Sequence, residues 1–258
     1  MRREYKKPPV NELVIGVYFA QPLLGLRAEH IGIFWKRLEK DFPGLEQQAP
    51  IKDLFIPAPN EQFPLPRYWL KSSDERYLIQ IQRNAFLLNW RKRGEGDYPH
   101  YKTVKEAFDK HYLEFAEFVR SDLKSSELAI ELCELSYVNL IESGATWTGP
   151  DDIAAVIPSY QSLKPTIPGA KLTEITAGNV FQVSNDLTLT VTLRTARRGK
   201  DKTPILFFEQ RASGQVADGT KGAADAWFDR AHEITGACFN SMTSAKFQND
   251  VWQLKGSQ

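Results

Sequence analysis

The stretch from Arg67 to Arg91 constrains the fold more than any other part of the chain. It contains three short runs rich in aromatic and aliphatic residues, separated by Ser72-Ser73-Asp74 and by Arg83-Asn84. Short apolar runs bounded by turn-forming residues are typical of strands joined by tight connections. The stretch therefore predicts an antiparallel meander that forms the sheet core of the first half of the chain.

Side chains alternate along the second and third runs of this meander. Apolar residues such as Ile79 and Ile81 stand at every second position of the second run. Because successive side chains of a strand point to opposite faces, one face of the meander is predicted to be apolar. The other face is then predicted to carry four polar residues: Gln80, Gln82, Asn89 and Arg91.

The remaining elements follow from the period of the apolar residues. Spacings of three and four predict helices at Leu26–Phe42 and Tyr98–Leu123, and a last helix that contains Trp227 and His232. Five prolines between residues 45 and 66 predict a long loop, with one short edge strand at Asp53–Ile56. Alternation predicts further strands at Asn11–Phe19 and Leu187–Arg197. A long strand with mixed faces, and therefore a bulge, is predicted at Glu127–Glu142, and strand-like runs at Pro204–Ala212 and, less regular, at about Leu172–Val183.

The order strand, helix, three or four strands, helix occurs twice, over residues 10–124 and 127–245. Almost no linker separates the two copies, so one continuous domain over residues 10–254 is expected. We predict an α+β fold in which one twisted antiparallel sheet carries the long helices on one face. This architecture is similar to the saddle of the TATA-box-binding protein. The alternative is a helix-grip fold, with a ligand cavity between the sheet and the last helix near Trp227 and His232. Neither fold carries a function with it.

Composition narrows the class of protein. The chain has 258 residues and a net charge of +1, without the basic excess that is typical of proteins that bind nucleic acid mainly through phosphates. Basic residues do cluster at Arg91-Lys92-Arg93 and at Arg197-Arg198-Gly199-Lys200. No apolar run approaches the length of a membrane span, and no secretory signal is evident, so a cytoplasmic protein is expected. Its two cysteines, Cys133 and Cys238, are expected to be reduced thiols.

The search for catalytic signatures gives no candidate catalytic residue. The sequence has no phosphate-binding loop, no dinucleotide fingerprint and no Cys-x-x-Cys pair. None of its four histidines forms the i, i+4 pair of a helical zinc site. Cys238 and His232 are six residues apart and lie on different faces of the predicted helix. We therefore expect no cofactor and no metal, and we favour a non-enzymatic protein over an enzyme.

Three segments suggest a family: the opening KPPVNELVIGVYF, the strand CELSYVNLIE, and the helix HEITGACFNSMTS with a tryptophan beyond it. Together they resemble the "sporadically distributed" family of uncharacterised prokaryotic proteins of about this length. Many members have an arginine before the tyrosine of the strand, where this chain has Ser136. The family has no function to carry over. Its patchy occurrence resembles that of genes that move between genomes, such as defence or toxin-linked genes.

The broad polar sheet face is the strongest functional feature of the sequence. We predict a non-enzymatic binding or adaptor protein that acts with a partner protein in a bacterial pathway. The alternatives are a nucleic-acid binder that uses the same face and the basic turns, and a small-molecule binder with the cavity described above. An ordinary solvent-facing side of a sheet, with threonine as a good strand former, would give the same pattern. The predicted binding residues are Gln80, Gln82, Asn89, Arg91, Thr190, Thr192 and Arg194, with a basic turn of Arg197, Arg198 and Lys200.

Overall fold

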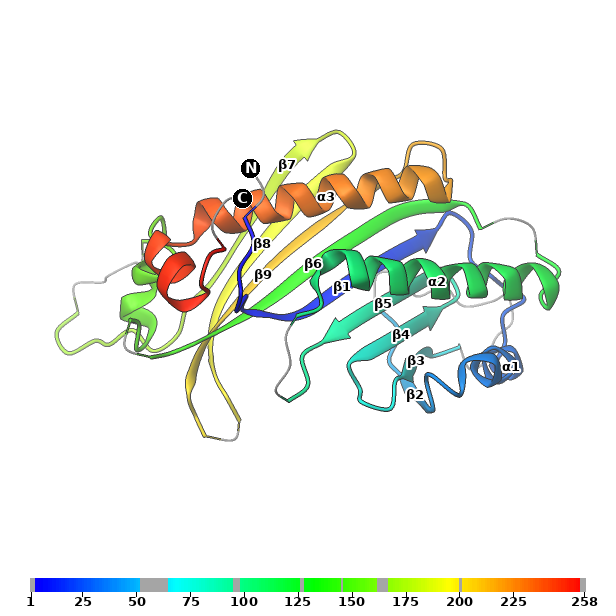
Figure 1. Cartoon of the computed structure of the whole chain (residues 1–258), viewed down its shortest axis with the longest axis horizontal. Coiled ribbons are helices and arrows are strands. Elements are labelled where there is room, and N and C mark those ends of the chain that lie inside the picture. The colour runs from blue at the N-terminus through cyan, green and yellow to red at the C-terminus, as the bar shows by residue number, and fades with distance from the viewer. Residues whose placement is uncertain are drawn as a thin grey trace. The chain divides into compact units, whose positions relative to one another are not determined.

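The computed structural model describes residues 3–51, 65–94, 98–125, 128–144, 146–161, 167–199 and 201–255 (Figure 1). These described residues form three α-helices, α1 (Ala28–Leu38), α2 (His100–Ser121) and α3 (Lys221–Met242), together with a 3-10 helix at Pro150–Ala155 and a π-helix at Phe247–Val251. The strands are β1 (Val10–Phe19), β2 (Gly44–Gln48), β3 (Arg67–Lys71), β4 (Tyr77–Gln82), β5 (Ala85–Arg91), β6 (Ile130–Glu142), β7 (Thr176–Ser184), β8 (Leu187–Arg197) and β9 (Pro204–Gln215).

The strands form one sheet in the order β2-β3-β4-β5-β1-β6-β9-β8-β7. The pairs β1–β5, β2–β3, β3–β4, β4–β5 and β7–β8 are antiparallel. The predicted α+β class with one large antiparallel sheet is therefore confirmed. In each half of the chain the first strand lies beside the last strand of the meander that follows, β1 beside β5 and β6 beside β9.

The chain divides into two compact units, which we describe separately. The first unit contains residues 12–135 and 213–228, and the second contains residues 1–11, 136–212 and 229–258. Strand β6 and helix α3 each run from one unit into the other. The repeat boundaries at 10–124 and 127–245 stay a prediction.

The core of the first unit lies between its strands and α2, which crosses β1 and β5 in Figure 1. Phe115 of α2 is fully buried, and its ring centroid lies 5.2 Å from that of Phe86 on β5, 5.3 Å from that of Phe34 on α1 and 6.2 Å from that of Phe19 on β1. Aromatic side chains bury large apolar areas. The face of β5 that carries Phe86 is thus the face that packs against α2.

The core of the second unit lies between β8, β9 and the C-terminal part of α3. Phe208 of β9 stacks on Phe239 of α3 with ring centroids 5.9 Å apart. Beyond α3 the chain packs back onto this helix, because Trp252 lies 5.0 Å from Phe239 and 6.0 Å from Tyr5, centroid to centroid. The alternation predicted for β8 is present: Leu187, Leu189, Val191 and Leu193 are buried.

Three element predictions need comment. Residues 45–66 are predicted to be a loop, yet the start of this stretch belongs to β2 (Gly44–Gln48). In its register with β3, Leu45 lies opposite Leu70 and Gln47 opposite Tyr68. Its side chains are mostly exposed, so backbone pairing with β3 forms this strand without the burial that creates a sequence pattern. The predicted strand Asp53–Ile56 lies outside the described residues. Helix α1 is shorter than the predicted Leu26–Phe42 and ends at Leu38. Beyond it, the N–H groups of Asp41 and Phe42 both bond Leu38 O and form a closing turn.

Replacing Phe115 with alanine tests the aromatic core. The change leaves a cavity among several packed rings, and such cavities cost about 3–5 kcal/mol of unfolding free energy. Leu113→Ala on the same helix is the control, because Leu113 is 60% exposed and its truncation should change stability by no more than about 0.5 kcal/mol. Urea denaturation measures both variants. Equal losses for the two would contradict this packing.

Candidate functional site

The outer face of the first unit, opposite α2, carries a chain of side-chain hydrogen bonds. Trp69 Nε1 and Arg67 Nη1 donate to Gln80 Oε1 at 3.0 and 2.9 Å. Gln80 Nε2 donates to Asn89 Oδ1 at 2.7 Å, and Asn89 Nδ2 donates to Glu12 Oε1 at 2.7 Å. Four strands, β1, β3, β4 and β5, contribute to this chain, which we call the amide chain.

The amide chain has one hydrogen-bonding direction. A carboxylate only accepts, so Glu12 fixes the NH₂ group of Asn89 toward itself and the carbonyl of Asn89 toward Gln80. Gln80 must then present its carbonyl oxygen to β3, where Trp69 stands directly opposite in the strand register. Both lone pairs of that oxygen are used, by Trp69 and by Arg67.

The amide side chains of this face are buried, whereas alternation alone predicts a face open to solvent. Gln80, Gln82 and Asn89 are 6%, 4% and 5% exposed. Gln82 accepts a hydrogen bond from the backbone N–H of Ile51 and donates to Asn84 Oδ1. Hydrogen-bonded amides of this kind can be buried at little net cost. Their predicted role in binding stays a prediction.

The two arginines beside the amide chain are half-buried and flank one indole. The guanidinium carbon of Arg67 lies 5.5 Å, and that of Arg91 5.9 Å, from the ring centroid of Trp69. Burial lowers the pKa of both arginines from their ordinary value, and the neighbouring charge of Arg93 lowers that of Arg91 further. The structure thus brings the predicted residues Gln80, Asn89 and Arg91 together with Arg67 and Trp69.

In the second unit the predicted residues lie on β8. Thr190 and Thr192 are half-buried, and Arg194 is exposed with its guanidinium carbon 5.1 Å from the ring centroid of Phe207. Thr190 pairs with Val180 and Thr192 with Gly178 of β7. This face has the polar, solvent-reaching character that the sequence indicated.

Strand β7 is the end strand of the sheet order, and it is exposed along almost its whole length. Val180, Phe181 and Val183 are 71%, 47% and 44% exposed. Between Thr176 and Ser184 the strand has no charged residue and no proline, although proteins commonly protect an edge with these residues.

Within the predicted basic turn, the charge of Arg198 is neutralised by carboxylates. Arg198 forms ion pairs with Glu142 at 2.7 Å and with Asp201 at 2.8 Å, which raises its pKa and holds that of Asp201 well below the ordinary value. Arg197 Nη1 donates to the carbonyl of Lys202 at 3.3 Å. Lys200 lies outside the described residues. Surface ion pairs of this kind leave little free charge for a phosphate.

Trp227 and His232, which the helix-grip alternative places beside a ligand cavity, contact other protein side chains. His232 Nδ1 lies 2.8 Å from the hydroxyl of Tyr137 in the second unit, and Trp227 packs edge-on against Phe228 in the first. Burial raises the pKa of the Cys133 thiol to about 12, and it also raises that of Cys238. Among the described residues no group of three or more His, Cys, Asp and Glu side chains could hold a metal ion.

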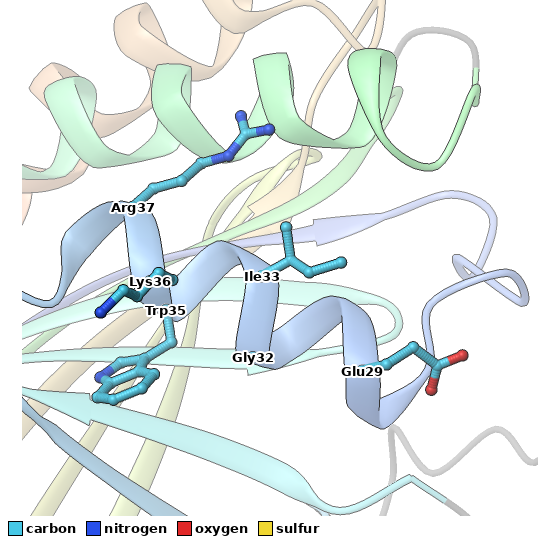
Figure 2. Close-up of a pocket in the computed structure, with 6 residues that line it drawn as sticks. All are labelled: Glu29, Gly32, Ile33, Trp35, Lys36 and Arg37. Atoms are coloured by element: carbon cyan, nitrogen blue, oxygen red, sulfur yellow. The ribbon is translucent and has the colours of Figure 1, made fainter.

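An open groove of about 540 Å³ runs along α1, and Figure 2 shows the residues that line it. Gly32 forms its middle, and nothing lies within 4 Å of the position that a Cβ would take there. Ile33 and Arg37 project on one side of the helix and Trp35 on the other. Such a wide surface depression does not enclose a small molecule.

Sequence reasoning missed Arg67, Trp69 and Glu12 as members of the site. Arg67 and Trp69 alternate with Tyr68 and Leu70 in β3, so period two already placed them on the outer face. Glu12 is 77 residues from Asn89 in sequence, and only the pairing of β1 with β5 brings the two together.

Comparisons with known proteins add little. No family model matches this chain, and no curated protein matches it. Among solved structures it is similar to the di-domain ARO/CYC protein BexL from the BE-7585A biosynthetic pathway, with a TM-score of 0.17 and 11% identity, over 89% of this chain and 97% of that one. A TM-score this low does not show a shared fold. No helix within the described residues is long and apolar enough to cross a membrane.

Gln80→Leu tests the amide chain. The substitution removes the acceptor of the half-buried Trp69 N–H and the donor to the buried Asn89, and an unpaired buried group costs about 1–3 kcal/mol. Chemical denaturation should therefore show a clear loss of stability. Gln215→Leu is the matched control, an exposed strand glutamine that should change stability by less than about 0.5 kcal/mol. A neutral Gln80→Leu variant would disprove the role of the chain.

Thiol modification tests the environments of the cysteines. Because only the thiolate reacts, raising the pH from 7 to 9 should speed the modification of Cys238 by a disulfide reagent in the folded protein. Cys133, with a pKa of about 12, stays protonated over this range and should react only after unfolding. A Cys238→Ala variant should show no labelling before unfolding; labelling of the folded variant would contradict the burial of Cys133.

Proposed function

We propose that this chain is a non-enzymatic binding or adaptor protein that acts with a partner protein in a bacterial pathway. The observation that carries the proposal is the exposed, uncharged edge strand β7 of the second unit. An unpaired edge presents a row of backbone N–H and C=O groups, onto which an extended segment of another protein can add as a further strand.

The side chains around this edge support such a contact. Val180 and Thr190 lie side by side on one face of the β7–β8 pair, and Phe181 and Leu189 on the other. An added strand would cover the exposed parts of Val180 and Phe181, whose burial is favourable by roughly 25 cal/mol per Å². Figure 1 shows β7 and β8 side by side in the second unit.

The composition of the edge indicates the kind of segment that fits. Between Thr176 and Ser184 the strand offers only apolar and uncharged polar side chains. Arg194 stands opposite Thr176, but its guanidinium lies over Phe207 of β9, on the side of β8 away from the free edge. We therefore propose that the partner segment is an extended, uncharged strand with apolar residues that cover Val180 and Phe181.

A charge placed on the edge tests the proposal. In lysate of the source cell, wild-type bait should retain a partner that Val180→Lys bait loses, because the lysine cannot be covered without removing its charge from water. Leu113→Lys is the control, because Leu113 on α2 is also apolar and is 60% exposed against 71% for Val180, and this variant should retain the partner. The retained protein, once purified, should bind Val180→Lys about tenfold or more weakly than wild type.

Two results would overturn the proposal. In the first, the partner binds Val180→Lys as well as wild type and fails to bind Leu113→Lys. In the second, the protein alone forms a dimer in light scattering that Val180→Lys disperses, which would assign the edge to a second copy of this chain.

A further inference from the structure

We propose that Arg67, Trp69 and Arg91 form a binding site for a small-molecule oxyanion, a carboxylate or a phosphate, on the outer face of the first unit. The site goes beyond the proposed strand addition. It depends on other residues, in the other unit, and on a separate set of observations.

The first observation is a pair of guanidinium groups without an ion-pair partner among the described residues. Both guanidinium groups lie within 6 Å of the centre of one indole ring. Within the described part of the chain, neither group has a carboxylate oxygen within the 4.0 Å of an ion pair. Glu12 on this face accepts a 2.7 Å hydrogen bond from Asn89 Nδ2. Its charge and those of Glu75 and Glu46 favour the charged form of Arg91 without forming an ion pair with it. A bound anion would supply the ion-pair partner that both guanidinium groups lack.

The second observation is the set of unused hydrogen-bond donors. A guanidinium has five N–H donors. The described acceptors take one from Arg67, at Gln80 Oε1, and one from Arg91, at the carbonyl of Glu75. The Nε atoms of both arginines are buried without a hydrogen-bond partner. Unpaired buried donors are rare in folded proteins, and a water or ion that completes them is one of the explanations for those that occur.

The third observation is the rigidity of the floor beneath the arginines. Gln80 and Asn89 are buried and held by the amide chain, whose direction Glu12 fixes. Trp69 is anchored by its bond to Gln80, and Arg67 by its bond to the same oxygen. A site whose groups are held in advance loses less entropy when a ligand binds.

These features together indicate the chemistry of the ligand. The planar fork of arginine matches the two oxygens of a carboxylate or the oxygens of a phosphate. The half-buried indole of Trp69 offers an apolar surface for the group that bears the anion. Both arginines are half-buried, so a compact anion reaches their remaining N–H groups more readily than a long polymer does.

Nuclear magnetic resonance of the arginine Nε–H groups tests the site in the full chain. The signals of Arg67 and Arg91 are assigned with Arg67→Gln and Arg91→Gln. Inorganic phosphate and benzoate are then titrated separately against sodium chloride of equal ionic strength. We expect both signals to shift and saturate with one of the two anions, phosphate for a phosphate site and benzoate for a carboxylate site, while chloride leaves them in place.

The variants add a binding readout. Arg67→Gln and Arg91→Gln should each lower the affinity for the anion by about tenfold or more, as expected for the loss of a charged donor. Arg211→Gln, an exposed strand arginine of the second unit, should bind within about twofold of wild type. If neither anion shifts the two signals of the wild-type protein beyond the chloride series, or if all three variants weaken binding equally, no such site exists.

Discussion

The packing of aromatic side chains between helix and sheet is the constraint on which the rest of the structure depends. In the first unit Phe115 of α2 meets Phe86 of β5, and in the second Phe239 of α3 meets Phe208 of β9. Because side chains alternate along a strand, fixing Phe86 toward the helix also fixes Asn89 toward the opposite face. The core thus decides which residues remain for binding.

The two units use the opposite face differently. In the first, the side chains of Gln80, Asn89 and Trp69 are joined by hydrogen bonds, and both amides are buried. Arg67 and Arg91 beside them keep unused hydrogen-bond donors. In the second, the polar face on β8 stays half-exposed beside the uncovered edge β7. One sheet can therefore hold a recessed polar site and an open strand edge, which suit different kinds of ligand.

Much of the fold could be predicted from periodicity. The meander, the helix around Phe108 and Phe115, and the alternation in β8 follow from local spacing. The burial of Gln80 could not be predicted, because alternation shows on which face of the sheet a side chain lies and not whether other residues cover that face. Glu12 reaches Asn89 only through long-range pairing, and β2 forms by backbone bonds that leave no apolar pattern. The exposed side of Phe181 could not be predicted either, since an apolar strand residue reads as core.

Hydrogen exchange along β7 tests the central claim most directly. In an antiparallel pair only alternate amides of an edge strand bond their neighbour, so half of the amides between Thr176 and Ser184 should exchange at nearly unprotected rates in the isolated protein. Adding the purified partner should slow those same amides, while the exchange of α2 remains unchanged. Continuous protection of β7 in the isolated protein, or no change when the partner binds, would contradict an open edge that recruits another strand.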